Sequence, residues 1–125
     1  MMSSDGTLED TNIDVWNKTI NVNLTSVYLG CKNVMPFLIG NGGVIINTAS
    51  FVGLMGSAAA QIAYTASKGG VISLSQELAA IYAKNNVRVV PLCPGPLHTE
   101  LLMKFLDTDE KKQRRLVHLP MGRFG

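Results

Sequence analysis

A long stretch without charge constrains this chain more than any other feature. Between Lys32 and Lys68 there is no Asp, Glu, Lys or Arg, and only 16% of the whole chain is charged. Soluble proteins carry about 25% charged residues on average. A stretch of this kind belongs inside a fold, inside a membrane, or inside a larger set of packed elements than 125 residues supply.

The stretch is poorly suited to crossing a membrane. A transmembrane helix needs about 20 mostly apolar residues in succession. Here prolines, glycines and asparagines interrupt the apolar runs at Pro36, Asn41, Gly42, Gly43, Asn47, Gly53 and Gly56. Residues 1–14 carry four acidic residues and no basic one, unlike a secretory signal or a mitochondrial presequence. We therefore expect a cytoplasmic protein without a membrane segment.

Charge and cysteine content argue against two further classes of protein. The net charge is only +2, and the basic run alternates with acidic residues: Lys111, Lys112, Arg114 and Arg115 lie near Asp107, Asp109 and Glu110. This pattern favours a solvated helix face over a nucleic-acid surface. The two cysteines, Cys31 and Cys93, lack the spacing of metal ligands. We expect reduced thiols, no metal site and no nucleic-acid partner.

Apolar residues recur at helical spacing over residues 11–38, in steps of three and four. Thr11 is placed to cap this helix, and Pro36 with the glycine cluster 40–43 is placed to end it. A second apolar stripe, Val15, Val22 and Leu29, lies on another face. A helix that is apolar on two sides is expected to be covered twice.

Two short β-rich runs follow, residues 44–46 and 87–92, and the first is typical of a strand buried on both faces. Between them, residues 59–84 form a second predicted helix. Its expected sheet-facing residues are Val71, Leu74, Leu78 and Ile81. With a short helix after the second strand, the order indicates an α/β architecture with a parallel sheet. Two strands are too few to cover these helices.

Tyr64 and Lys68 are four residues apart on the second predicted helix, so both project from one face, one turn apart. An ammonium near a phenol lowers the pKa of the phenol and makes it a usable acid or base. Taken alone, the pair favours an ordinary interpretation, a half-buried tyrosine beside a surface lysine.

Three other polar positions accompany this pair. Ser50 follows the first strand, at the carboxyl edge where α/β sheets build their sites. Asn23 lies between the apolar stripes of the first helix, where its amide must find a partner. The turn Pro94-Gly95-Pro96, with Thr99, follows the second strand and exposes backbone groups that could hold a ligand.

Together these segments resemble the short-chain dehydrogenase/reductase family, from about Thr7 to Gly125. Four motifs stand in the family's order and approximate spacing: the Val-Asn-Leu segment with Asn23, Ser50 followed by x-x-Gly, Tyr64-x-x-x-Lys68, and Pro94-Gly95-x-x-x-Thr99. Four motifs in register are a far more specific signal than any one of them.

The resemblance implies an NAD(P)-dependent oxidoreductase that interconverts a small-molecule alcohol and a carbonyl. Tyr64 would exchange the proton with the substrate oxygen, which Ser50 would orient. Lys68 would favour the phenolate and hold the nicotinamide ribose, and Asn23 would anchor a water that links Lys68 to solvent. Asn23, Tyr64 and Lys68 would thus serve both catalysis and cofactor binding.

The resemblance also implies further contacts to NAD or NADP. Pro94, Gly95 and Leu97 would border the nicotinamide, and Thr99 would bond its carboxamide or a phosphate. The family's Gly-x-x-x-Gly-x-Gly turn, which cradles the pyrophosphate, does not occur in this sequence. Its last helix and strand are also missing.

We therefore expect a partial Rossmann-type, doubly wound parallel sheet, with residues 1–125 forming one incomplete NAD(P)-binding domain. Family members commonly pair through their two long helices, so a homodimer or homotetramer is the implied assembly. The alternative is a non-catalytic module that acts only through helix-mediated dimerisation.

Overall fold

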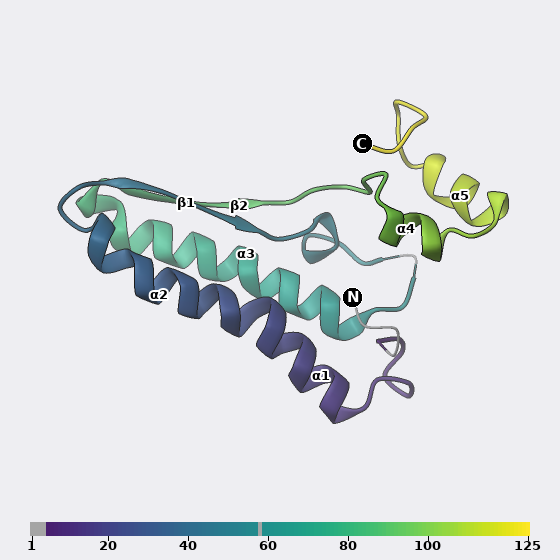
Figure 1. Cartoon of the computed structure of the whole chain (residues 1–125), viewed down its shortest axis with the longest axis horizontal. Coiled ribbons are helices and arrows are strands. Elements are labelled where there is room, and N and C mark those ends of the chain that lie inside the picture. The colour runs from purple at the N-terminus through teal and green to yellow at the C-terminus, as the bar shows by residue number, and fades with distance from the viewer. Residues whose placement is uncertain (1–4, 58) are drawn as a thin grey trace. The chain divides into compact units, whose positions relative to one another are not determined.

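A computed structural model gives the structure of residues 5–57 and 59–125. The chain divides into two compact units, Met1–Cys93 and Pro94–Gly125. Helices and strands alternate in the first unit (Figure 1): α1 (Ile13–Ile20), α2 (Ser26–Leu38), β1 (Gly43–Thr48), α3 (Ile62–Tyr82) and β2 (Val87–Leu92). Short turns of other helix types lie between them: a π-helical turn (Asn21–Thr25) and two 3-10 turns (Phe51–Gly53 and Ala83–Asn85). The predicted α/β order and the parallel sheet are confirmed.

The first long helix begins at a different cap from the one predicted. Asn12, not Thr11, caps it, and the Asn12 Oδ1 accepts the N–H of Val15 at 2.9 Å. The Thr11 hydroxyl is already engaged in the preceding loop, where its oxygen accepts the N–H of Gly6 at 2.9 Å. Asn and Thr can both cap a helix. Because the Thr11 hydroxyl is hydrogen-bonded within the loop, Asn12 provides the cap.

The helix continues through the π-helical turn and past a proline. The prediction that Pro36 helps to end it is wrong, because α2 continues to Leu38. Proline removes the hydrogen bond to the carbonyl of Lys32, but both residues are exposed, so water can reach that carbonyl. The chain turns in the glycine cluster, where Gly40 and Gly42 have φ angles of 93° and 71° that favour glycine.

Among the described residues, helices cover one face of the two strands. β1 and β2 pair from Gly43 opposite Val87 to Thr48 opposite Leu92, and α2 and α3 lie on the same side of them (Figure 1). Alternate side chains on the other face are exposed: Val44, Ile46, Val90 and Leu92. The prediction that residues 44–46 are buried on both faces is therefore wrong for the part of the chain that the structure describes.

Two clusters of buried side chains join the strands to the helices. Met35 of α2 packs against Val87 and Val89 of β2. Ala49, just after β1, packs against α3 at two adjacent buried residues, Val71 and Ile72. These contacts fix the end of β1 on the surface of α3.

The buried face of α3 combines residues at every fourth position, Ala63, Ser67, Val71 and Ser75, with the larger Ile72. The prediction that Ile81 faces the sheet is wrong, because its side chain is 55% exposed. α3 also begins three residues later than Ala59, at Ile62, because Ser57 holds the preceding loop by accepting the N–H of Ala59 at 3.2 Å.

α1 and α2 bury one side, so the predicted double covering is absent from the described residues. Val15 of the second apolar stripe is buried, whereas Val22 and Leu29 of the same stripe are 62% and 47% exposed. A π turn holds more residues than an α turn, so it rotates α2 relative to α1 and moves this stripe out of the core. Within residues 5–57 and 59–125, no helix combines the length and the apolar character needed to cross a bilayer.

A buried polar group links α2, β1 and α3. The Asn47 amide donates to the Ser75 hydroxyl at 3.0 Å and lies beside the Cys31 thiol. Both cysteines are free thiols, Cys31 buried and Cys93 half-buried. Because Asn47 faces inward from the strand, its hydrogen bond with α3 satisfies a polar group that burial would otherwise destabilise.

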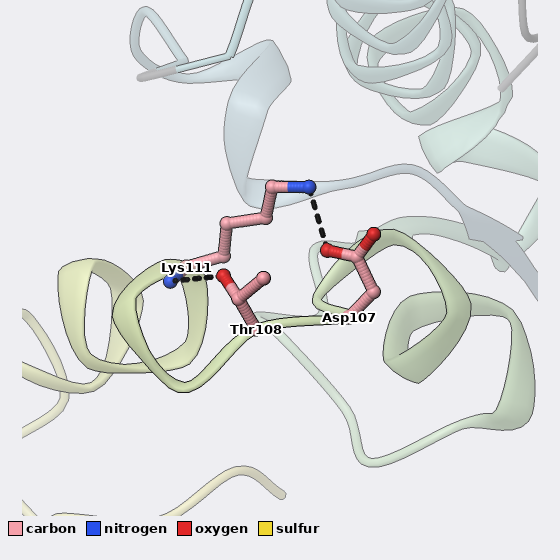
Figure 2. Close-up of polar contacts among 3 residues, drawn as sticks. All are labelled: Asp107, Thr108 and Lys111. Carbon is pink, nitrogen blue, oxygen red and sulfur yellow. Dashed lines mark hydrogen bonds and ion pairs between the residues drawn. The ribbon is translucent and has the colours of Figure 1, made fainter.

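The second unit contains α4 (Glu100–Phe105) and α5 (Asp109–Leu116). Figure 2 shows the start of α5, where Thr108 Oγ1 accepts the N–H of Lys111 at 3.3 Å and the Lys111 ammonium donates to Asp107 at 2.6 Å. This hydrogen bond and charge lower the pKa of the Asp107 carboxyl. The basic run therefore lies on a solvated helix with acidic neighbours, as predicted.

Candidate active site

The first turns of α3 carry Tyr64 and Lys68 on one face. The Lys68 Nζ lies 5.7 Å from the centroid of the Tyr64 ring, within the range of a cation–π contact. The helical spacing predicted this juxtaposition. Both side chains are half-buried. For Tyr64 this agrees with the ordinary interpretation, whereas Lys68 is more buried than a surface lysine.

Lys68 is anchored to the end of β1. Its ammonium donates to the carbonyl oxygen of Thr48 at 2.9 Å. Burial disfavours the charged form and lowers the pKa of Lys68 below its ordinary value of 10.5. The carbonyl occupies one of the three N–H groups of the ammonium. Within residues 5–57 and 59–125 no hydrogen-bond partner is found for the other two, which suits them to a ligand.

Asn23 reaches the pair through a serine. Its side-chain amide donates to the Ser67 hydroxyl at 3.0 Å, and Ser67 in turn donates to the carbonyl of Tyr64 at 2.7 Å. The amide thus has the partner that its position demanded. The hydrogen bond goes to the residue before Lys68 rather than to Lys68 itself. Asn23 stands in the π-helical turn, a distortion that often marks functional sites in helices.

Ser50 is buried just beyond β1, and the following turn holds it near α3. Its carbonyl accepts the N–H of Gly53 at 3.0 Å. Gly53 lies directly on the helix backbone, because a Cβ built there would fall 2.8 Å from the Lys68 carbonyl carbon and 2.8 Å from the Gly69 nitrogen. Only glycine permits so close an approach, which explains the Ser-x-x-Gly spacing in physical terms.

Two residues at this site were missed in the sequence analysis. Ser67 is fully buried, and a serine in a helix gives no sign of whether it faces the core. Asp5 is 8% exposed and accepts the N–H of Tyr64 at 2.8 Å, although 59 positions separate the two residues. No local spacing could have revealed that contact.

The remaining predicted residues, Pro94, Gly95, Leu97 and Thr99, belong to the second unit. Within it, Thr99 caps α4, and its Oγ1 accepts the N–H of Leu102 at 3.2 Å. A Cβ on Gly95 would meet no atom within 4 Å. The first unit by itself brings together Asn23, Ser50, Tyr64 and Lys68 around the start of α3 and the end of β1.

The first unit is an α/β fold with a parallel strand pair, and a tyrosine and a lysine lie near the carboxyl end of β1. This combination is typical of α/β enzymes, whose sites lie at the carboxyl ends of the strands. The family model described as short chain dehydrogenase matches residues 2–110. The chain belongs to this family, and its fold is a partial Rossmann fold of that type.

Individual relatives agree with this assignment. The 2-(R)-hydroxypropyl-CoM dehydrogenase of Xanthobacter autotrophicus is 34% identical over 98% of this chain and 49% of its own length. The inactive 2-(S)-hydroxypropyl-CoM dehydrogenase 2 of the same organism is also 34% identical, over 96% of this chain and 54% of its own length. A crystal structure from Burkholderia xenovorans, assigned to the short-chain dehydrogenases/reductases, superposes with a TM-score of 0.87 at 35% identity, over 98% of this chain and 46% of that one. The chain thus spans about half the length of the relatives that it matches.

Proposed function

We propose that this chain supplies the proton-transfer half of an NAD(P)-dependent oxidoreductase that interconverts an alcohol and a carbonyl compound. One observation carries the proposal. The Tyr64 ring stands over the Lys68 ammonium, and that ammonium is fixed to the carboxyl end of β1. A phenol and an ammonium so arranged form a proton donor with a positive charge held beside it.

Each of the four residues has a distinct task in this proposal. The Tyr64 hydroxyl donates a proton to the substrate oxygen during reduction and takes it back during oxidation. Lys68 holds a positive charge beside the Tyr64 ring, Ser50 orients the substrate oxygen, and Asn23 anchors a water through which Lys68 is resupplied with protons. These assignments follow the family motifs and the positions of the four side chains in the first unit.

The residues fit one part of a nicotinamide cofactor. When bound, the nicotinamide supplies or accepts the hydride. Lys68 is half-buried and keeps N–H groups beyond the one given to Thr48, which suits it to ribose hydroxyls. Pro94, Gly95, Leu97 and Thr99 are the proposed contacts from the second unit. In such domains the residue that distinguishes NAD from NADP follows the glycine-rich turn. That turn does not occur in this sequence, so the proposal covers NAD and NADP alike.

Exposed apolar side chains on α2 also support a proposal about assembly. Phe37 is 74% exposed, and a groove of about 260 Å³ between α2 and α3 is lined by residues that include Tyr28, Met35 and Tyr82. We propose that these two helices pair with a second copy. If pairing were the only function, the chain would be a non-catalytic module, and one relative that is named inactive makes that a real second candidate.

A chimera tests the choice between these two functions. The chain replaces the matching segment of an active relative, and the product is screened with ketones, aldehydes and alcohols in the presence of NADH, NADPH, NAD⁺ and NADP⁺. Turnover that is lost in the Tyr64→Phe chimera supports the oxidoreductase. A folded chimera that associates through its helices but turns over no substrate, while the unmodified relative does, supports the non-catalytic module.

A further inference from the structure

The amino-terminal loop caps the helix that carries Tyr64, across 59 residues of sequence. The first N–H groups of a helix have no partner within that helix. In α3 the N–H of Ile62 donates to the Gly6 carbonyl at 3.3 Å, and the N–H groups of Ala63 and Tyr64 donate to Asp5 Oδ1 and Oδ2 at 3.1 Å and 2.8 Å. Residues 5 and 6 thus satisfy three successive donors.

The local capping residue does not perform this task. Gln61 precedes α3, but its side chain makes no capping hydrogen bond and donates instead to the Ser57 hydroxyl at 2.8 Å. A residue of the amino-terminal loop also holds the Asp5 side chain, because Thr11 Oγ1 donates to its Oδ1 at 3.4 Å. A buried carboxylate also suits the positive end of a helix dipole.

The peptide groups of Tyr64 are held on both sides. Asp5 accepts its N–H, and Ser67 donates to its carbonyl oxygen, with Asn23 donating to Ser67 in turn. Among the described contacts, no other residue of the proposed catalytic set has both its N–H and its carbonyl oxygen bound by side chains. The direction of the Tyr64 side chain depends on that backbone.

We propose that Asp5 is a positioning residue, which fixes the backbone of Tyr64 so that its hydroxyl stands in the orientation needed for proton transfer. The proposal rests on the proposed function of Tyr64. Asp5 itself touches no reacting atom. An aspartate suits the position because each of its two oxygens accepts one N–H, whereas an asparagine offers one oxygen and turns an NH₂ group toward the other donor.

The test compares three variants of the chimera: Asp5→Ala, Asp5→Asn and the matched control Asp10→Asn. Asp10 lies in the same loop, but its hydrogen bonds go to Thr7 and are exposed. Misplacement of a reacting group by about 1 Å can cost about 100-fold in rate. We expect Asp5→Ala to lower kcat by roughly 10- to 100-fold with little change in KM for substrate or cofactor. Asp5→Asn should recover part of this loss, and Asp10→Asn should behave like the unmodified chimera.

A second measurement does not depend on activity. Amide hydrogen exchange in the 125-residue chain should show Ala63 and Tyr64 losing protection in Asp5→Ala, while Val71, two turns further along the helix, keeps it. This local loss is the expected signature of a missing cap. Loss of protection along the whole helix, or at neither amide, overturns the proposal.

The kinetic outcomes are equally decisive. The positioning role is overturned if Asp5→Ala keeps the unmodified kcat, or if kcat, KM and thermal stability change together, since Asp5 is then merely structural. If the unmodified chimera is folded but shows no turnover, the proposed function itself fails, and the positioning role fails with it. In that case a local loss of protection still shows that Asp5 caps α3.

Discussion

Tyr64 and Lys68 have different surroundings although one helical turn separates them. The backbone of Tyr64 is fixed because its N–H donates to Asp5 and its carbonyl accepts from Ser67, whereas the Lys68 ammonium donates to a strand carbonyl. One residue is therefore held by its main chain and the other by its charged end. Substitutions at the two positions should have different consequences.

Tyr64→Phe should abolish turnover in the chimera while cofactor binding survives. The change removes only the hydroxyl that donates the proton, and the ring still packs over the Lys68 ammonium. Steady-state kinetics and a fluorescence titration with NADH or NADPH measure the two properties separately. Retained turnover would remove Tyr64 from the catalytic role, and loss of both properties would point to damage beyond the hydroxyl.

Lys68 should lose its proton at lower pH than an ordinary lysine. Its pKa lies below 10.5 because burial penalises the ammonium. As the pH rises from this lowered pKa toward 10.5, the unfolded chain holds a proton that the folded chain has released, so the Lys68 contribution to stability rises with pH. Above the lowered pKa the positive charge beside Tyr64 is gone.

An NMR titration of ¹³Cε-labelled lysines measures this pKa, and Lys68→Arg identifies the Lys68 signal by removing it. Arg stays charged throughout the range, so the extra rise in stability with pH should also be absent from that variant. A Lys68 midpoint at or above 10.5 would contradict the expectation.

Residue type alone revealed part of the site. An amide between apolar stripes had to find a partner, and Asn23 has one in Ser67. The Tyr64–Lys68 contact followed from helical spacing. Asp5 and Ser67 could not be recognised, because one contact joins distant parts of the sequence and the other depends on which face of α3 is buried. The catalytic roles of Asn23, Ser50, Tyr64 and Lys68 stay predictions.

At the scale of elements, the contact between the 3-10 turn Phe51–Gly53 and α3 depends on one glycine, Gly53. Gly53→Ala would place a Cβ 2.8 Å from backbone atoms of α3, which cannot move aside as a side chain can. We expect a loss of about 1–3 kcal/mol in the free energy of unfolding. Urea denaturation of the 125-residue chain measures this loss.

Gly56→Ala is the matched control for this change. It lies three positions further along the chain, and a Cβ there would meet no atom of the described residues within 4 Å. Its effect should stay within about 0.5 kcal/mol, as is usual for surface substitutions. Equal stabilities of the two variants would mean that the turn can leave the helix without cost.

The sequence predicted the bounds of some strands and helices better than those of others. β2 has the predicted bounds, residues 87–92. β1 is longer than residues 44–46, since its ladder with β2 extends to Gly43 and Thr48, one of them a glycine that strand propensity disfavours. The π-helical turn was not predicted, because its residues are ordinary helix residues. Periodicity identifies the apolar faces of a helix or strand but not which of them another element covers. The exposure of Val22, Leu29 and Ile46 therefore could not be predicted from the sequence.

At the scale of the whole molecule, the strand pair has one open apolar face among the described residues. Its outer face exposes Val44, Ile46, Val90 and Leu92. The chain spans about half the length of its relatives, and the excess of apolar residues is on surfaces that a longer chain of this family could cover. The expectation of one incomplete domain over residues 1–125 stays a prediction beside the two compact units of the structure.

The 125-residue chain by itself should bind nicotinamide cofactors weakly. Lys68 can hold the ribose end, but the sequence has no glycine-rich turn for the pyrophosphate, which provides much of the grip in nucleotide-binding domains of this type. Fluorescence titration of the chain with NADH and NADPH measures the affinity, with the chimera as the control that should bind. Micromolar binding of either cofactor to the chain alone would contradict this expectation.

The π-helical turn between α1 and α2 determines where along the first helix a change in length can be absorbed. Each residue of an α-helix turns the chain by about 100°. Because the π turn holds one residue more than an α turn, deleting one residue within Asn21–Thr25 would restore a regular helix and leave Cys31 and Met35 facing the core. The same deletion between the π turn and Cys31 would turn both side chains out of the core by about 100°. A change in length by one residue should therefore be tolerated in Asn21–Thr25 more readily than elsewhere in the helix, although the segment does not lie in a loop.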